Sequence, residues 1–179
     1  MTAHPGAAPG DAADVVNRTV RYTAWSVFAR SPQAGAPVDT GAGADELRAW
    51  EAGLAEHDVI VRGWYDVSGV RAGTDVMSWI HAPSAEAIQA ALRAFRRTRT
   101  GAGTTLVWSA FGTHRPAEFA RDHAPSFMLG KPPLGWLCVY PFVRSYDWYL
   151  LPEAERGEML REHGLAGRAF PAVQANTVS

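Results

Sequence analysis

The sequence predicts an α+β fold made of ferredoxin-like repeats, and two observations support this prediction. Apolar residues first follow the periods of strands and helices in the order β-α-β-β-α-β, which is the ferredoxin-like unit. The first half of this order then returns after residue 134. Because two such units pack sheet against sheet, we expect a dimeric α+β barrel whose second repeat is incomplete in this chain.

Each element of the first unit is predicted from its periodicity. The strand-like segments alternate between the two sheet faces. The helix-like segments carry apolar residues three or four positions apart, as at Ile88, Leu92 and Phe95. The expected strands span 19–28, 59–67, 75–81 and 104–111, and the expected helices span 45–56 and 85–98.

The second unit is predicted from a long strand at 136–149, a helix at 153–164 and the start of another strand at 171–179. Such a half-unit leaves strand edges without partners, so we expect the chain to be a C-terminally truncated version of a longer protein. The predicted organisation is a disordered tail at 1–17, a ferredoxin-like unit at 18–112, a connecting loop at 113–134 and a partial unit at 135–179.

Composition excludes several classes of function. A net charge of -1 over 179 residues gives no electrostatic basis for binding nucleic acid or anionic membrane. Cys138 is the only cysteine, which excludes an internal disulfide and a CxxC site, and its apolar surroundings predict a core position. No apolar run approaches the ~20 residues of a membrane span, so we expect a cytoplasmic protein.

Tyr140 and Arg144 are candidate site residues because they fall on the same face of the predicted strand at 136–149. Pro141 makes the register beyond it less regular, since proline favours a strand edge or a bulge. A phenol and a guanidinium on one rigid face suit a large anionic ligand. The alternative for Tyr140 is a core tyrosine with a satisfied hydroxyl group, which is the commoner arrangement.

His163 is the candidate metal ligand. It lies four residues after Met159 and three after Leu160, on the apolar stripe of the predicted helix. The alternative is a histidine placed near a helix C-terminus, where the helix dipole favours it and Gly164 ends the helix. Haem iron needs only one protein ligand, so a lone histidine together with Tyr140 and Arg144 is compatible with an iron porphyrin. Structural zinc would need more ligands.

The irregular segment 112–133 carries His114 and His123. Long loops often bind ligands, and His123 suits acid–base chemistry near neutral pH, although many loop histidines merely face water. Sequence motifs of serine hydrolases, zinc proteases, phosphate-binding loops and EF-hands are absent.

Residues 140–152, with the sequence YPFVRSYDWYLLP, and 163–168, with HGLAGR, closely resemble the actinobacterial coproheme decarboxylases of the chlorite dismutase-like family. The resemblance extends to 63–66 and 75–81. It implies a barrel that assembles into pentameric rings. It also implies oxidative decarboxylation of two propionates of iron coproporphyrin III (coproheme) to vinyl groups, which gives haem b with hydrogen peroxide as oxidant. Transient contact with coproporphyrin ferrochelatase is a further implication.

The same resemblance implies a role for each candidate residue. His163 matches the proximal iron ligand. Tyr140 matches the tyrosine that becomes a radical and abstracts hydrogen from the propionate β-carbon. His123 matches the distal histidine that helps deprotonate peroxide. Fixed arginines are expected around the carboxylates of the substrate, so Arg144, and more weakly Ser145 and Tyr149, are the predicted substrate-binding residues.

Three alternatives stay open at this point. The chain is also compatible with a chlorite-consuming or peroxidase haem enzyme, whose distal arginine would lie beyond Ser179. It is compatible with a non-catalytic haem-binding protein. A ferredoxin-like interaction domain without a cofactor is the third alternative, and failure to shift a porphyrin absorption band would identify it.

Overall fold

The computed structural model describes residues 15–16, 18–32, 40–115 and 124–178. It forms two units, Met1–Leu137 together with Thr177–Ser179, and Cys138–Asn176. The predicted tail at 1–17 falls almost wholly outside the described residues. Val16, near its end, is buried, and its backbone carbonyl accepts hydrogen bonds from the backbone of Thr19 and from the ring of His114.

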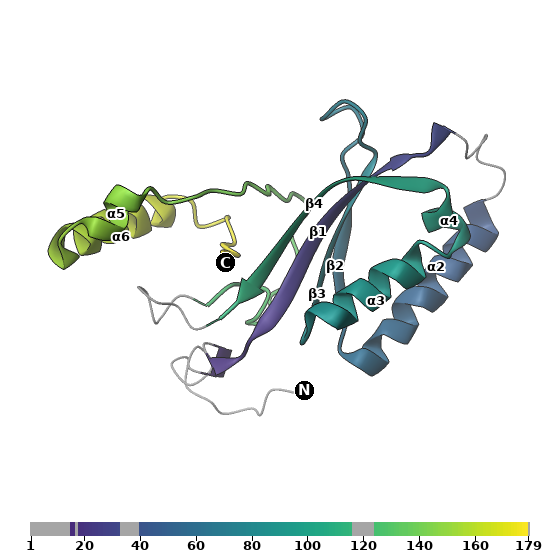
Figure 1. Cartoon of the computed structure of the whole chain (residues 1–179), viewed down its shortest axis with the longest axis horizontal. Helices are drawn as coiled ribbons and strands as arrows, with labels where there is room; N and C mark the ends of the chain where they lie inside the picture. Colours follow the sequence, from purple (N-terminus) through teal and green to yellow (C-terminus); the bar gives the residue numbers. More distant parts are fainter. Residues whose placement is uncertain (1–14, 17, 33–39, 116–123, 179) are drawn as a thin grey trace. The chain divides into compact units, whose positions relative to one another are not determined.

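The first unit is a four-stranded antiparallel sheet with the order β2-β3-β1-β4 (Figure 1). This is the ferredoxin-like order, so the predicted fold of this unit is confirmed. The strands are β1 (Arg21–Arg30), β2 (Ile60–Asp66), β3 (Val76–Ala82) and β4 (Thr104–His114). The helical elements are α2 (Thr40–Leu54), η2 (Ala55–His57), α3 (Ala85–Phe95) and α4 (Arg99–Ala102).

Helix α3 shows why the local sequence forms this element. The Ser84 hydroxyl accepts a hydrogen bond from the backbone N–H of Ala87 at 3.1 Å and caps the helix. The helix ends at Phe95, three residues before the predicted end, because the chain turns there into α4. A Cβ atom at Gly101 would lie 2.0 Å from the backbone oxygen of Phe95, so only glycine permits this close approach.

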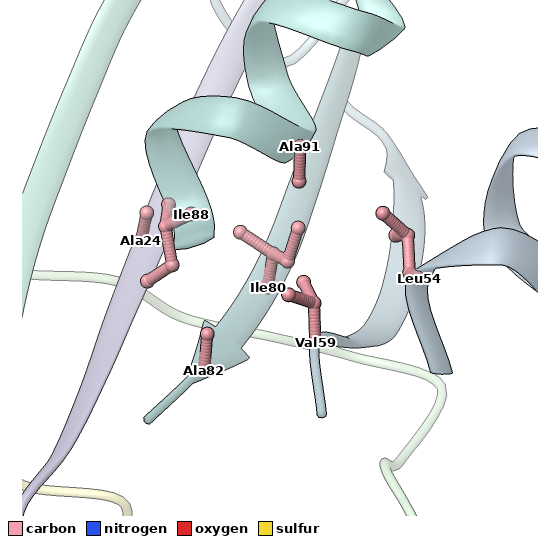
Figure 2. Packing of buried hydrophobic residues seen from close by; sticks show 7 residues of the cluster. All are labelled: Ala24, Leu54, Val59, Ile80, Ala82, Ile88 and Ala91. Carbon is pink, nitrogen blue, oxygen red and sulfur yellow. The ribbon is translucent and has the colours of Figure 1, made fainter. Parts of the chain in front are cut away.

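The core of the first unit lies between the sheet and helices α2 and α3, which cover one sheet face (Figure 1). Figure 2 shows the side chains that meet there: Ala24, Leu54, Val59, Ile80, Ala82, Ile88 and Ala91. Their transfer out of water stabilises the unit, at about 25 cal/mol per Å² of apolar surface.

The opposite face of the sheet, which we call the far face, carries the alternate residues of the central strands. Trp25 of β1 pairs with Trp79 of β3, and their rings stack with centroids 6.0 Å apart. Phe127, which follows the first unit's last strand in the chain, packs its ring 5.8 Å from Trp79 and 5.0 Å from His81. Trp79 and His81 on the far face are therefore also buried, under a turn of the connecting segment.

The predicted strand at 136–149, in the second unit, is wrong. Residues 131–145 form no helix or strand, and residues 146–150 are helical. The helices of this unit are α5 (Tyr146–Leu150) and α6 (Glu153–Arg168). A strand requires a neighbour to hydrogen-bond to, and no described strand pairs with this segment. Pro141 moreover offers no backbone N–H group.

Three further predictions for this unit are wrong. The predicted strand at 171–179 is irregular over residues 173–178, and Cys138 is exposed rather than buried. Helix α6 continues to Arg168 instead of ending near Gly164, because Gly164 keeps a negative φ and does not end the helix in the left-handed region. None of the helices in the described part of the chain is long and apolar enough to cross a lipid bilayer.

Candidate functional site

Most of the predicted site residues belong to the second unit. The unit Cys138–Asn176 contains all of them except the predicted acid–base histidine. That residue, His123, lies outside the described residues. The residues within the unit are Tyr140, Arg144, Ser145, Tyr149 and His163.

Tyr140 lies in the irregular segment before α5, with 71% of its surface exposed. Its ring centroid lies 6.3 Å from that of Phe142, two residues later, so the two rings project on the same side. This local alternation does not continue into the predicted strand face, because residues 131–145 form no strand. The exposure argues against the alternative of a core tyrosine within the described part of the chain. The phenol of Tyr140 is accessible to a ligand.

Ser145 makes a structural contact that the predicted strand at 136–149 did not anticipate. Its hydroxyl oxygen accepts a hydrogen bond from the backbone N–H of Trp148 at 3.3 Å and caps α5. Asp147 stands in the first turn, where the helix dipole favours a carboxylate. A serine followed by an aspartate two residues later is a helix-start signal, and it identifies α5 in the sequence.

Arg144 and Tyr149 meet at the side chain of Trp148. The guanidinium carbon of Arg144 lies 4.5 Å from the centroid of the Trp148 ring, which is a cation–π contact. The ring of Tyr149 meets Trp148 edge-on at 5.2 Å. Trp148 is 9% exposed and is the buried side chain of α5. The structure therefore brings Arg144 and Tyr149 to the indole of Trp148, while Ser145 bonds the backbone N–H group of the same residue.

Arg156, which was not among the predicted site residues, belongs to the same cluster. Its guanidinium carbon lies 6.0 Å from the centroid of the Trp148 ring. Arg144 precedes Trp148 in the sequence, and Arg156 follows it. Its Nη1 donates hydrogen bonds to the backbone oxygens of Tyr149 at 3.1 Å and Leu151 at 2.5 Å. In the sequence, Pro152 could have indicated this contact. As the N-cap of α6, it leaves an arginine of the first turns of α6 close to the carbonyls that end α5.

His163 is exposed on α6, and the described residues supply no hydrogen bond to its ring. It lies five residues before the last residue of the helix, so the dipole at the C-terminus does not account for it. Met159, on the predicted apolar stripe, is 49% exposed, and no residue of α6 is buried. The imidazole is thus available to a ligand that approaches this stripe.

His81 is a buried histidine on the far face of the first unit, with 4% of its surface exposed. Its Nδ1 accepts a hydrogen bond from Nε of Arg21 at 2.5 Å, and Arg21 pairs with Asp58 at 2.8 Å. Burial, followed by the charges of Arg21 and Arg62, lowers the pKa of His81 from 6.5 to about 3. His81 is therefore neutral near pH 7.

Metal chemistry at the candidate site rests on one histidine. Within the described ranges, no three His, Cys, Asp or Glu side chains cluster as metal ligands. This arrangement does not provide the closed ligand set of a structural zinc site. An iron porphyrin, which brings four ring nitrogens of its own, requires only one imidazole.

Comparisons with known proteins agree with this chemistry. The sequence profile of the chlorite dismutase family matches residues 41–179. A coproheme decarboxylase of Mycolicibacterium smegmatis is 47% identical over 167 residues, which cover 92% of this chain and 71% of that protein.

Solved structures share the fold. A mutant chlorite dismutase from Candidatus Nitrospira defluvii has a TM-score of 0.65 and 18% identity, over 84% of this chain and 66% of that one. The same organism's chlorite dismutase in complex with imidazole has a TM-score of 0.58, 18% identity and the same coverage. The chain thus spans slightly less than two thirds of the solved chains.

Proposed function

Because the chain belongs to the chlorite dismutase family, we propose that it carries the porphyrin-binding residues of a coproheme decarboxylase. The substrate would be iron coproporphyrin III and the product haem b. The observation that carries this proposal is the second unit, where an accessible imidazole, an accessible phenol and two arginines stand on one short stretch of chain. The relative that is 47% identical supports the choice of reaction.

The residues of the second unit fit this substrate. The ring of His163 has no hydrogen-bond partner among the described residues, which leaves a nitrogen free to bind the iron. Coproporphyrin carries four carboxylates, and Arg144 is a permanent cation whose planar fork matches a carboxylate. The hydroxyl of Ser145 accepts a bond from α5 and keeps its proton for a substrate oxygen. Tyr149 presents its phenol beside them.

Tyr140 is the proposed catalytic residue. Iron coproporphyrin supplies the oxidising equivalents once peroxide has reacted with it. Tyr140 would give one electron to the oxidised iron porphyrin and its phenol proton to a base, and its phenoxyl radical would take a hydrogen atom from the propionate β-carbon. Loss of carbon dioxide, with transfer of a second electron to the oxidised iron porphyrin, would leave a vinyl group. Each propionate thus consumes one hydrogen peroxide and yields one carbon dioxide and two waters, so two equivalents complete the conversion.

His123 is the proposed base that takes the peroxide proton, because a neutral imidazole suits this step near pH 7. We further propose a cytoplasmic homo-oligomer, a pentamer by analogy with the family, which light scattering would test. A transient contact with coproporphyrin ferrochelatase would deliver the substrate.

The test is mass spectrometry of the porphyrin after the chain is mixed with ferric coproporphyrin III and two equivalents of peroxide. We expect stepwise loss of two carboxyl groups. Replacement of Tyr140 by phenylalanine should leave porphyrin binding intact and abolish decarboxylation, because the phenol O–H that carries the radical is removed.

Tyr146→Phe is the matched control, since this neighbouring tyrosine is 90% exposed and has no proposed role. Full turnover by Tyr140→Phe would refute the role of Tyr140. Failure of the unaltered chain to bind or convert coproporphyrin would count against the proposed function itself.

A further inference from the structure

Helices α5 and α6 are joined at a corner formed by residues 151–152, where no side chain caps the start of α6. Leu151 and Pro152 are extended, with φ and ψ of -60° and 149° and of -52° and 145°. Pro152 stands at the N-cap of α6 and provides no side-chain hydrogen bond there. Pro152 therefore contributes no side-chain hydrogen bond that would orient α6 against α5.

Arg156 supplies that contact. Its Nη1 bonds the backbone oxygen of Tyr149, inside α5, and that of Leu151, at the corner. The carbonyls at a helix C-terminus lack intrahelical partners and carry the negative end of the dipole, so a guanidinium is a favoured partner. The same guanidinium lies 6.0 Å from the Trp148 ring, which Arg144 also contacts, at 4.5 Å. One side chain thus connects both helices to the proposed substrate-binding arginine.

His163 lies on the helical face that Arg156 directs toward this corner. Residues seven apart in an α-helix are two turns apart and differ by only about 20° around the axis. The rise between Arg156 and His163 is about 10 Å. A tilt of α6 by about 10° would therefore displace His163 by about 2 Å.

We infer that Arg156 is a positioning residue, which sets the proximal ligand His163 relative to the carboxylate-binding residues of α5. This inference rests on the proposed function. Hydrogen abstraction by Tyr140 tolerates little misplacement of the porphyrin, and a displacement of about 1 Å can lower a rate on the order of 10²-fold. Arg156 acts through the backbone of Tyr149 and Leu151 and is not itself a catalytic residue.

Arg156→Gln is the principal variant, because glutamine keeps a polar amide but is too short and uncharged to hold both carbonyls. Arg161→Gln is the matched control. Arg161 stands on the same helix, nearly opposite His163, and makes an exposed ion pair with Glu158 at 3.4 Å. Arg156→Lys restores the charge without the planar fork, so partial rescue is expected.

Two readouts separate positioning from folding in the full chain. Electron paramagnetic resonance of added ferric coproporphyrin III reports the geometry of the iron–histidine bond, and steady-state kinetics report KM and kcat. For Arg156→Gln we expect a broadened iron signal and a kcat lowered on the order of 10²-fold. KM should change by only a few-fold, and circular dichroism should be unaltered. Arg161→Gln should match the unaltered chain.

An iron signal and a kcat for Arg156→Gln that match those of Arg161→Gln would overturn the inference. If Arg156→Gln does not fold, Arg156→Lys takes its place in the comparison. An iron signal and a kcat for Arg156→Lys equal to those of Arg161→Gln would then overturn the inference. His163→Ala keeps the two proposals apart. If that variant retains the histidine-type signal, the ligand assignment in the proposed function is wrong, whatever Arg156 does.

Discussion

Helix α3 in the first unit buries Ile88, Ala91 and Phe95, whereas helix α6 in the second unit buries none of its residues, although it has 16 residues against 11. Short helices gain most of their stability from packing of an apolar face rather than from intrinsic propensity. The first unit therefore holds itself together through its own core. The second unit is held by local contacts at the α5–α6 corner and leaves the side chains that we propose to bind the ligand accessible.

This contrast assigns different tasks to the two units. The residues proposed to bind the porphyrin and react with it, His123 apart, lie in the unit with little buried surface, where exposed apolar side chains mark surfaces that bind something else. These include Tyr140, Phe142, Val143, Leu150 and Met159. The first unit supplies the stable sheet. Substitutions should accordingly affect stability in one unit and ligand binding in the other.

The largest expected effect on stability comes from truncation of the core. Ile80 is 1% exposed and packs between the sheet and helix α3 (Figure 2), so Ile80→Ala should lower the free energy of unfolding by about 4 kcal/mol. Met159→Ala in α6 removes a side chain that is already half exposed and should cost less than about 0.5 kcal/mol. Urea denaturation followed by circular dichroism measures both. Equal losses would mean that the two units are not stabilised differently.

A smaller effect should follow from the pH. The pKa of His81 is about 3 in the folded chain and returns to its ordinary value of 6.5 on unfolding, so the unfolded chain binds the proton more readily between these values. Stability is therefore fully present above pH 6.5 and is lost as the pH falls toward 3. Between pH 6.5 and 5 the loss should reach about 2 kcal/mol, since one pKa unit corresponds to about 1.4 kcal/mol.

Urea denaturation at several pH values measures this slope. His81→Asn keeps an acceptor for Nε of Arg21 and removes the titrating group, so its stability should depend less on pH over this range. An unchanged slope in His81→Asn would show that other groups cause the loss. The pKa of Asp58 is lowered mainly by its hydrogen bond from Arg21, and its contribution is lost only at lower pH.

The smallest expected effect concerns two equivalent helix caps, one in each unit. Ser84 caps α3 and Ser145 caps α5, each by accepting a backbone N–H bond. Ser84→Ala should lower the free energy of global unfolding by about 1 kcal/mol. Ser145→Ala should leave global unfolding of the first unit unchanged. It should instead increase amide hydrogen exchange within residues 146–150, measured by NMR, because the cap stabilises a local helix. A reversed pattern would contradict the division of tasks.

Part of this protein is determined by the sequence alone. Alternation along β1 and β3 and the helical spacing in α3 specified the first unit and its order of strands, because each of these segments finds its partner within the chain. The residues of the candidate site were proposed from the sequence, partly by their side-chain chemistry and partly by the family resemblance, and their roles stay predictions.

The tertiary structure alone decided how those side chains are held. The segment 136–149 has the alternation of a strand, yet α5 forms within it, because Ser145 caps a helix while no described strand offers hydrogen bonds. The role of Arg156 depends on backbone carbonyls that become available only when the chain turns at Pro152. Periodicity records which face a side chain prefers, but a strand or a corner forms only where a hydrogen-bonding partner is present.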